Sequence, residues 1–553
     1  MRKYTENAMN NKSPLQNKRL QYIPLVPETT KDLRKLKFTK KEMAEPESDQ
    51  LEIKKIFGKT YGQEIVAFES SSETETKPLR IGVVFSGGQA AGGHNVISGL
   101  FDAIKDLHKD GKLFGFLNGP SGIVENKYVE ITEEKLKDYR NQGGFDLIGS
   151  GRTKIESEDQ LKASLDTALK LKADGIVIIG GDDSNTNAAV LAEYFLNHNC
   201  STKVVGVPKT IDGDLRSKDI EMSFGFDTAC KTYSELIGNI CKDSLSAKKY
   251  YHFIRLMGRS ASHIALECAF KTQPNLTLIG EEIKQKNISL KEVVSMISEL
   301  IIKRSEMNKN YGVVLIPEGI IEFIDEVRKL IEELNVMLAT GSKHLDAINL
   351  LKEHSEVLKY LKQHLNELSF ACFEILPKDI QKQLLLDRDP HGNVQVSKIE
   401  TEKLLLDMVK KDLKEKGFKG KFSAVAHFFG YEGRSALPTN FDANYCYNLG
   451  RLSALLINQG LTGYIACIKN LKAPVDSWQY YGLPLTMLMN IEHRHGKNKP
   501  VIRKYLVDLN SKAFQEFSKL RDKWELDDHY LLAGPIQFYG DKELTDSSPF
   551  TIK

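Results

Sequence analysis

The segment from Pro208 to Asp214 carries side chains that are typical of phosphoryl-transfer chemistry. It sets a lysine, a threonine and two aspartates within a few positions of one another. A turn needs only one residue of this kind, whereas a phosphoryl-transfer site uses all of them. In such a site Asp212 would orient or deprotonate an attacking hydroxyl, and Lys209 would neutralise the developing phosphate charge.

Two further loops fit an anionic ligand and its metal less specifically. Gly87 and Gly88 open a run of small residues that ends at Gly93. Their N–H groups can approach a phosphate at a helix N-terminus, although a tight structural turn would use the same glycines. Asp182 and Asp183 can hold Mg²⁺ together with substrate phosphates, but Asp at a helix start also serves as a cap. Neither loop matches a P-loop or a dinucleotide-binding fingerprint.

Arginines in glycine-flanked loops add candidate anion-binding groups. Arg152 lies in IGSGRTKI, Arg259 follows Met257 and Gly258, and Arg434 ends YEGR. A guanidinium holds a phosphate through two parallel hydrogen bonds. A single arginine of this kind is more often a solvated or ion-paired surface side chain than a phosphate ligand.

Hydrophobic periodicity places these loops at the carboxyl ends of strands. The apolar runs LRIGVVF, GIVIIG and KVVGVP each lead into one of the three loops, and helical patterns follow the first two. Continuous apolar strands that alternate with amphipathic helices are typical of a parallel sheet covered on both faces. Ligands of such sheets bind beyond the carboxyl ends of the strands, so we expect the three loops to face one shared cleft.

Later strand-and-loop patterns, in YYHFIRLMGRS, GVVLIPEG and FSAVAHFFGYEGR, indicate a second α/β domain. A stretch of helical periodicity interrupts it, with Leu358, Leu361, Leu365 and Leu368 on one helix face that would pack in a hairpin or a dimer contact. The expected organisation is an N-terminal extension (1–77), a larger α/β domain (78–245), a second α/β domain (246–321 with 419–500), a helical insertion (322–418) and a helical tail (501–553).

Composition narrows the class of protein. The 553 residues are 41% hydrophobic and carry a net charge of +3, which disfavours a dedicated nucleic-acid binder. No apolar run reaches the length that spans a bilayer, and the start has no secretory h-region. The seven cysteines include no Cys-x-x-Cys pair. We therefore expect a cytoplasmic protein with reduced thiols and with neither membrane nor nucleic-acid partners.

Taken together and in order, GGDDS, PKTIDGDL, MGRSASHIALE, IPEG and GYEGR-x-x-x-P resemble the motifs of the phosphofructokinase family. The resemblance runs from about residue 81 to about residue 470, apart from the helical insertion. It implies two Rossmann-like three-layer α/β domains of the phosphofructokinase fold, with extensions at both ends. Within the family, the length and the loops resemble the long, pyrophosphate-dependent branch.

The resemblance also implies roles for individual residues. Asp212 would take the proton from the 1-hydroxyl of fructose 6-phosphate, Thr210 and Asp214 would position substrate and metal, and Asp182 would hold Mg²⁺. The larger domain would bind pyrophosphate and Mg²⁺, and the second domain fructose 6-phosphate. Pyrophosphate would be bound by Gly87, Gly88, Arg152, Asp183 and Lys209. Fructose 6-phosphate would be bound by Thr210, Ile211, Asp212, Met257, Gly258, Arg259, Glu318, Tyr431, Glu432, Gly433 and Arg434. Arg259 would also stabilise charge on the transferred phosphoryl group. Lys249 and Tyr250 would bind fructose 6-phosphate in the site of a neighbouring subunit of a homodimer.

Donor choice follows from two positions at which ATP-using relatives carry glycine. Asp183 would face the α-phosphate of ATP, and like charges about 4 Å apart repel by roughly 4 kcal/mol at an effective dielectric constant near 20. At about 1.4 kcal/mol for each tenfold change in affinity, this repulsion would weaken ATP binding almost a thousandfold. Lys209 supplies a cation to the small, highly charged pyrophosphate.

The predicted reaction is therefore the reversible formation of fructose 1,6-bisphosphate and phosphate, in glycolysis or gluconeogenesis. The alternatives are an ATP-dependent phosphofructokinase, a non-catalytic regulatory subunit or a sugar-phosphate sensor on the same scaffold. A non-catalytic protein would have lost the base, whereas TIDGD is intact.

Overall fold

The computed structural model describes residues 12–73, 75–339, 342–351, 353–386, 394–494, 497–534, 540, 542–546 and 548–552. Parts of the expected N-terminal extension (1–77), helical insertion (322–418) and tail (501–553) thus lie outside the described residues. The chain divides into two compact units. Unit 1 takes in Met1–Thr232, Glu432–Tyr505 and Ile536–Ile552, and unit 2 takes in Tyr233–Tyr431 and Leu506–Pro535.

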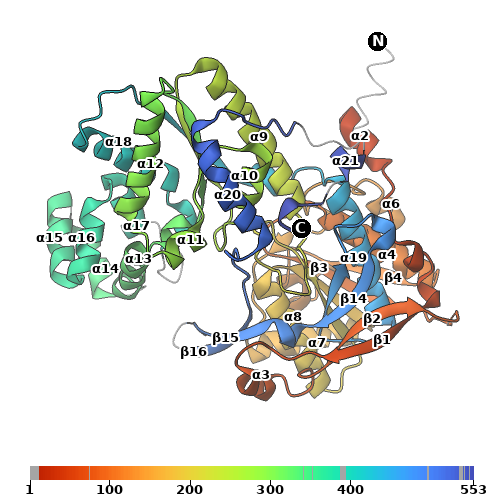
Figure 1. The fold of residues 1–553 in the computed structure, drawn as a ribbon. Coiled ribbons are helices and arrows are strands. Elements are labelled where there is room, and N and C mark those ends of the chain that lie inside the picture. The colour runs from red at the N-terminus through yellow and green to blue at the C-terminus, as the bar shows by residue number, and fades with distance from the viewer. Residues whose placement is uncertain are drawn as a thin grey trace, which may run out of the picture. The chain divides into compact units, whose positions relative to one another are not determined.

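A mixed sheet is the centre of unit 1 (Figure 1). Its order is β1-β2-β14-β13-β8-β7-β3-β4-β5, with β6 paired to β3. From β13 to β4 all neighbours are parallel, and β14, β2, β1 and β5 add antiparallel edges. The strands are β1 (Leu36–Met43), β2 (Glu64–Ser70), β3 (Arg80–Ser86), β4 (Lys112–Phe116), β5 (Tyr128–Ile131), β6 (Ser150–Gly151), β7 (Gly175–Gly180), β8 (Lys203–Pro208), β13 (Tyr464–Lys469) and β14 (Gln479–Pro484).

Helices cover both faces of this sheet, as the continuous apolar strands predict. Val84, Ile176 and Ile178 belong to a core cluster that includes residues of α7 and α8, whereas their neighbours Val83 and Val177 are buried on the opposite face. There α4 packs along α19. The helices are α2 (Pro14–Leu20), α3 (Gln50–Ile56), α4 (Gly93–Leu107), α5 (Ser121–Val124), α6 (Glu133–Leu136), α7 (Glu158–Leu171), α8 (Asp182–Asn197), α19 (Asn440–Asn458), α21 (Lys542–Thr545) and the start of α9 (Phe226–Ala247).

The order of the parallel strands creates a topological switch point. The chain leaves β3 through α4 toward β4, on one side, and leaves β7 through α8 toward β8, on the other. Connections of this kind are right-handed, so α4 and α8 lie on opposite faces and the loops after β3 and β7 part from each other. Ligands of open α/β sheets bind at this point.

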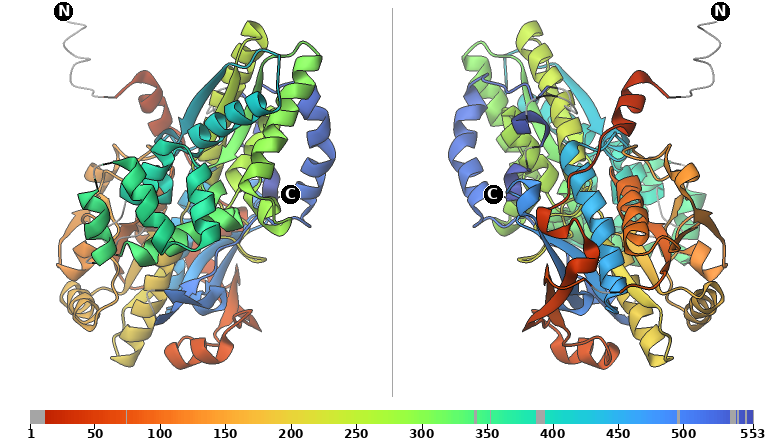
Figure 2. Two further views of the ribbon diagram at one scale, coloured as in Figure 1. Left: turned by 90° about the vertical axis from the view of Figure 1, so that its left-hand side faces the viewer. Right: turned by 90° about the vertical axis from the view of Figure 1, so that its right-hand side faces the viewer.

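Unit 2 is built on a smaller, wholly parallel sheet of order β10-β11-β9-β12. Its strands are β9 (Tyr251–Leu256), β10 (Leu276–Thr277), β11 (Gly312–Pro317) and β12 (Ala424–Phe429). Its helices, besides the rest of α9, are α10 (His263–Thr272), α11 (Gly280–Gln285), α12 (Leu290–Glu306), α13 (Asp325–Met337), α14 (Lys343–Leu350), α15 (His354–His364), α16 (Glu367–Ile375), α17 (Lys378–Leu386), α18 (Thr401–Glu415) and α20 (Lys512–Leu526). Helices α13–α17 gather in one region of this unit, and α18 packs against α12, β9 and β12 (Figure 1 and Figure 2).

The segment between β11 and β12 is helical wherever the structure describes regular elements, and it shares one core with the sheet of unit 2. Tyr251 and Phe253 of β9 belong to the same cluster as residues of α13, α16 and α18. The expected leucine face is only partly continuous. Leu361 and Leu365 are buried, but Leu368 is 79% exposed, because α15 ends at His364 and a new helix begins at Glu367.

Residues 432–500, which the sequence places in the second α/β domain, belong to unit 1. The reason is strand pairing: β13 joins β8 in parallel, and β14 continues the same sheet to β2. The N-terminal segment is likewise part of unit 1, since β1 and β2 form its edge. Beyond β14, the hairpin β15 (Met489–Arg494) and β16 (Lys497–Ile502) packs against α8. Periodicity identifies a strand but not the sheet that it joins.

Two further observations concern the cysteines and the helices. All seven cysteines lie among the described residues, where they are buried and form no disulfide. Within the described ranges, no helix has both the length and the apolar character needed to cross a membrane.

Gly99 of α4 should be intolerant of any side chain. A Cβ there would overlap the carbonyl oxygen of Tyr447 on α19, and one on Gly450 would overlap that of Val96. Gly99→Ala should therefore lower the free energy of unfolding by about 3 kcal/mol, the upper range for overpacking, as measured by urea denaturation. The control is Gly58→Ala, where the nearest atom is 3.9 Å from the new Cβ; equal losses in both variants would contradict this packing.

Candidate active site

The loop after β3 is surrounded by cationic side chains. Gly87 has a φ of +88° and donates its N–H to the carbonyl of Gly151 at 2.8 Å. The ammonium of Lys209 donates to the carbonyl oxygen of Gly88 at 2.8 Å. A Cβ on Gly88 would lie 3.1 Å from a guanidinium nitrogen of Arg434 and 3.7 Å from one of Arg152. The structure thus brings together Gly87, Gly88, Arg152 and Lys209, all of which the sequence analysis assigned to one anion.

Arg434 also lies beside the glycine loop, although the sequence analysis assigned it to fructose 6-phosphate. Its guanidinium donates to the carbonyl oxygen of Gln89 at 3.3 Å, so it lies beside the loop after β3. The four residues of YEGR fall on both sides of a unit boundary, because Tyr431 belongs to unit 2 and Glu432, Gly433 and Arg434 belong to unit 1. Tyr431 is 74% exposed.

The two aspartates after β7 form the first turn of α8. Each meets a lysine from another segment: Asp182 lies 3.7 Å from the ammonium of Lys504, and Asp183 lies 3.3 Å from that of Lys154. Both lysines were missed by the sequence analysis. Lys154 follows Arg152 by two residues in the same loop, and this alternation of basic residues could have marked Lys154 as a second cation of the site. Lys504 lies in no motif, and only the tertiary structure places it here.

The loop after β8 is held by its own backbone. Lys209 donates its N–H to the carbonyl of Gly180 at 3.0 Å, so the loops after β7 and β8 stay in register. Thr210 accepts the N–H of Asp212 through its hydroxyl at 3.1 Å, and Gly213 turns the chain with a φ of +75°. Of the Asp212 carboxylate, the oxygen Oδ1 is buried and has no hydrogen-bond partner.

Burial and crowding of charge shift two groups in this loop. Burial, and then the neighbouring Arg434, lower the pKa of Lys209 to about 8, against the opposing effect of Asp212. Burial, and then Asp212 and Asp182, raise the pKa of Asp214 to about 7. Groups with shifts of this kind cluster at functional sites. Acidic and basic charges therefore meet at the carboxyl ends of β3, β7 and β8, beside the switch point.

A divalent cation fits this donor set. Asp212 and Asp182 each raise the pKa of Asp214, so both lie near Asp214, and Asp212 has a buried oxygen without a hydrogen-bond partner. Across the described ranges, no three His, Cys, Asp or Glu side chains gather as metal ligands. Mg²⁺ is commonly held by one or two carboxylates with substrate phosphates, so the residues present suffice.

A second set of predicted residues meets in unit 2. Gly258, with a φ of +132°, donates its N–H to a carboxylate oxygen of Glu318 at 3.0 Å. Glu318 is buried, and a Cβ on Gly319 would overlap the backbone of Arg259. Because β9 and β11 are parallel neighbours, Met257, Gly258, Arg259 and Glu318 share one sheet edge.

Lys249 and Tyr250 do not join that set. They precede β9, whereas Met257 follows it, and a strand of six residues is about 20 Å long at roughly 3.3 Å per residue. The ammonium of Lys249 lies over the ring of Tyr250, 5.2 Å from its centroid. Their predicted role toward a neighbouring subunit stays a prediction.

Asp214→Asn should stabilise the metal-free protein in a pH-dependent way. Between pH 3.8 and about 7 the folded carboxyl is protonated while the unfolded one is ionised, so the stability of the unmodified chain falls as the pH rises through this window and is level above it. An asparagine at this position does not titrate, so it causes no fall in stability as the pH rises. The difference in the free energy of unfolding should grow from pH 4 to pH 7, to on the order of 2 kcal/mol.

Urea titrations with EDTA at pH 5 and pH 8 measure this difference. A stability gain that is equal at both pH values would show that Asp214 is ionised in the folded state throughout.

Comparisons with known proteins identify the family of this chain. The family profile described as Phosphofructokinase matches residues 80–355. The chain is 50% identical over 547 residues to the pyrophosphate–fructose 6-phosphate 1-phosphotransferase of Porphyromonas gingivalis, which covers 98% of each chain. It is 53% identical over 495 residues to the subunit beta 1 of the Arabidopsis thaliana enzyme of the same name, covering 88% of this chain and 85% of the relative.

Among solved structures, the pyrophosphate-dependent phosphofructokinase of Nitrosospira multiformis aligns with a TM-score of 0.53 at 15% identity. The alignment covers 85% of this chain and 96% of that one, and it confirms the predicted fold. Together with the identity of half of all residues to a relative over nearly the full length, the profile match shows that the chain belongs to the phosphofructokinase family.

Proposed function

We propose that this chain reversibly transfers a phosphoryl group from pyrophosphate to the 1-hydroxyl of fructose 6-phosphate, which gives fructose 1,6-bisphosphate and phosphate. One observation carries the proposal: relatives that share about half of its residues over 98% of this chain and at least 96% of their own length bear the name of this activity. The function predicted from the loops is thereby confirmed, and the chain is a pyrophosphate-dependent phosphotransferase. The assignment of residues to roles rests on the geometry of each unit.

The donor is bound by the loops after β3 and β7. The ammonium of Lys209 lies over the glycine turn, where a Cβ on Gly87 would be 3.2 Å from it, and Arg152 and Arg434 flank Gly88. Three cationic side chains around one glycine turn favour the binding of a small polyanion. Asp183 lies at the helix start with its carboxylate half exposed, where it would repel the extra phosphate of a nucleotide.

Asp212 is the proposed general base. Its buried oxygen without a partner is available to accept the proton of a hydroxyl, and the bond from its own N–H to Thr210 fixes the loop. A base within hydrogen-bond reach of the attacking hydroxyl contributes about a hundredfold to ten-thousandfold to the rate. Most of the remaining catalysis is positioning and charge neutralisation.

Mg²⁺ is the proposed metal, held by Asp182 with Asp214 nearby. When bound, it would neutralise charge on the phosphates of the donor. The protein's own cations, Lys209 and Arg434 above all, supply the fixed positive charge around the donor loop.

The acceptor sugar is assigned to the sheet edge of unit 2. Glu318 is buried and fixed by the N–H of Gly258, which orients a carboxylate for sugar hydroxyls, and Arg259 brings a cation to the same edge. Tyr431 is a further proposed contact from unit 2. The sugar-binding roles of Ile211, Glu432 and Gly433, which belong to unit 1, stay predictions. We further propose a cytoplasmic homodimer in which Lys249 and Tyr250 serve the neighbouring subunit.

An assay of donor choice tests the proposed function. Purified protein with fructose 6-phosphate and Mg²⁺ should form fructose 1,6-bisphosphate with pyrophosphate at least a hundredfold faster, in kcat/KM, than with ATP, because Asp183 and Lys209 occupy the positions that ATP-using relatives leave open. Adding orthophosphate and fructose 1,6-bisphosphate should run the reaction backward. Turnover with ATP alone would contradict the donor assignment, and sugar-phosphate binding without turnover would favour a sensor.

Asp212→Asn should abolish most turnover without loss of the fold. Asparagine keeps the shape but cannot accept the proton, so kcat should fall about a thousandfold while KM for both substrates stays within about threefold. Steady-state kinetics measure the change, with a thermal melt to verify folding. The control is Asp110→Asn in an exposed turn, which should leave kcat unchanged; a fully active Asp212→Asn would refute the base assignment.

A further inference from the structure

Lys504 reaches the acidic loops from a part of the chain that no motif marks. It lies two residues beyond the hairpin β15–β16, and its ammonium is 3.7 Å from a carboxylate oxygen of Asp182. Its side chain is 38% exposed and that of Asp182 is 28% exposed. The ion pair thus lies at the rim of the site, where a lysine retains contact with solvent and with any ligand that enters.

The backbone on both sides of Lys504 is tied to the loops of the site. On one side, Ile502 donates its N–H to the hydroxyl of Thr186 at 3.0 Å, and that hydroxyl donates to the carbonyl of Asp182 at 2.9 Å. On the other side, Tyr505 donates its N–H to the carbonyl of Asp214 at 2.8 Å. The backbone at Lys504 is therefore fixed between the start of α8 and the loop after β8.

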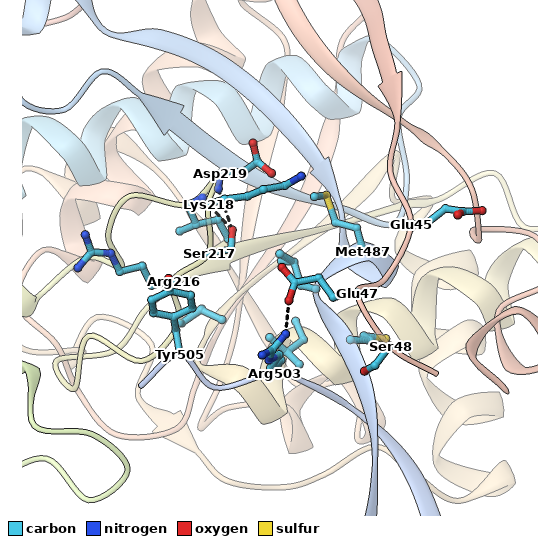
Figure 3. A pocket seen from close by; sticks show the side chains of 15 residues that line it. Glu45, Glu47, Ser48, Arg216, Ser217, Lys218, Asp219, Met487, Arg503 and Tyr505 are labelled. Carbon is cyan, nitrogen blue, oxygen red and sulfur yellow. Dashed lines mark hydrogen bonds and ion pairs between the residues drawn. The ribbon is translucent and has the colours of Figure 1, made fainter. Parts of the chain in front are cut away.

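The side chains next to Lys504 point elsewhere. Arg503 and Tyr505 line a separate cavity of about 70 Å³, together with Arg216, Ser217 and Met487, and Arg503 pairs there with Glu47 (Figure 3). Lys504 is not among the residues that line this cavity. Arg503 and Tyr505 thus line this cavity, whereas the ammonium of Lys504 lies beside Asp182.

Charge balance gives this placement a function. The other described cations of the donor loop, Lys209, Arg152 and Arg434, gather around Gly88 after β3. The aspartates lie after β7 and β8, where they repel a polyanion. Two lysines, Lys504 beside Asp182 and Lys154 beside Asp183, supply positive charge on that acidic side and so lower the repulsion of an approaching phosphate. A lysine binds phosphate as a mobile point charge, and Lys504 is placed for this by the backbone bonds of Ile502 and Tyr505 to the loops after β7 and β8.

We propose that Lys504 is a further residue of the donor subsite, whose ammonium binds a phosphate of pyrophosphate or the orthophosphate of the reverse reaction. This inference rests on the proposed function. It assigns Lys504 alone of this segment to the donor subsite, and it predicts that cations contact the donor from both the glycine side and the aspartate side.

Substitutions at two adjacent positions test the proposal. Lys504→Met should raise KM for pyrophosphate and for orthophosphate about tenfold, leave KM for fructose 6-phosphate within twofold, and weaken the binding of methylenediphosphonate in calorimetry by a similar factor. Lys504→Arg should restore at least half of the loss. The matched control is Arg503→Met, which removes a cation from the other side of the same segment and should leave all three KM values unchanged.

The outcomes separate this inference from the proposed function. If the unmodified protein uses pyrophosphate and Lys504→Met does so with an unchanged KM, Lys504 does not contact the donor. An equal rise in every KM, or the same effect in Arg503→Met, would reduce Lys504 to a structural role and overturn the inference. No turnover of pyrophosphate by the unmodified protein would refute the proposed function itself, and in that case unaltered binding of methylenediphosphonate by Lys504→Met would refute the inference separately.

Discussion

The parallel pairing of β3, β7 and β8 is the constraint on which the rest of unit 1 depends. Their register puts three carboxyl ends at one edge, so glycines, aspartates and a lysine that are far apart in the chain meet there. Two hydrogen bonds of Lys209 fix the loops relative to one another. Its backbone N–H donates to the carbonyl of Gly180, and its ammonium donates to the carbonyl of Gly88. A register slip of one residue would turn each of these side chains to the other face.

Bringing these charges together costs stability. The pKa values of Asp214 and Lys209 are both shifted toward the neutral form of the side chain, which means that the surrounding protein disfavours both charges. Strain of this kind is common where a site is built for a charged ligand, because the ligand offsets it on binding. The ion pairs of Lys154 and Lys504 relieve part of the repulsion among the aspartates, and they lie where solvent weakens them.

Unit 2 shows how an inserted segment is fixed to a sheet. Arg255 of β9 lies 2.7 Å from a carboxylate oxygen of Glu402 on α18 and donates to the carbonyl of Ile399 at 2.9 Å. Both side chains are almost fully buried, so the pair specifies one arrangement more than it adds stability. Arg255 is two residues from Met257, and the helical segment is thus anchored next to the loop proposed to bind the sugar.

The sequence by itself determined the α/β class, the three loops after β3, β7 and β8, and the presence in those loops of Asp182, Asp183, Lys209 and Asp212, because strand periodicity and loop composition are local properties. It did not determine which sheet β13 and β14 join, and it missed Lys154 and Lys504. Only the tertiary structure decided these points. Pairing partners and ion pairs between distant segments depend on contacts across hundreds of residues, such as that of Lys504 with Asp182, and no local pattern records them.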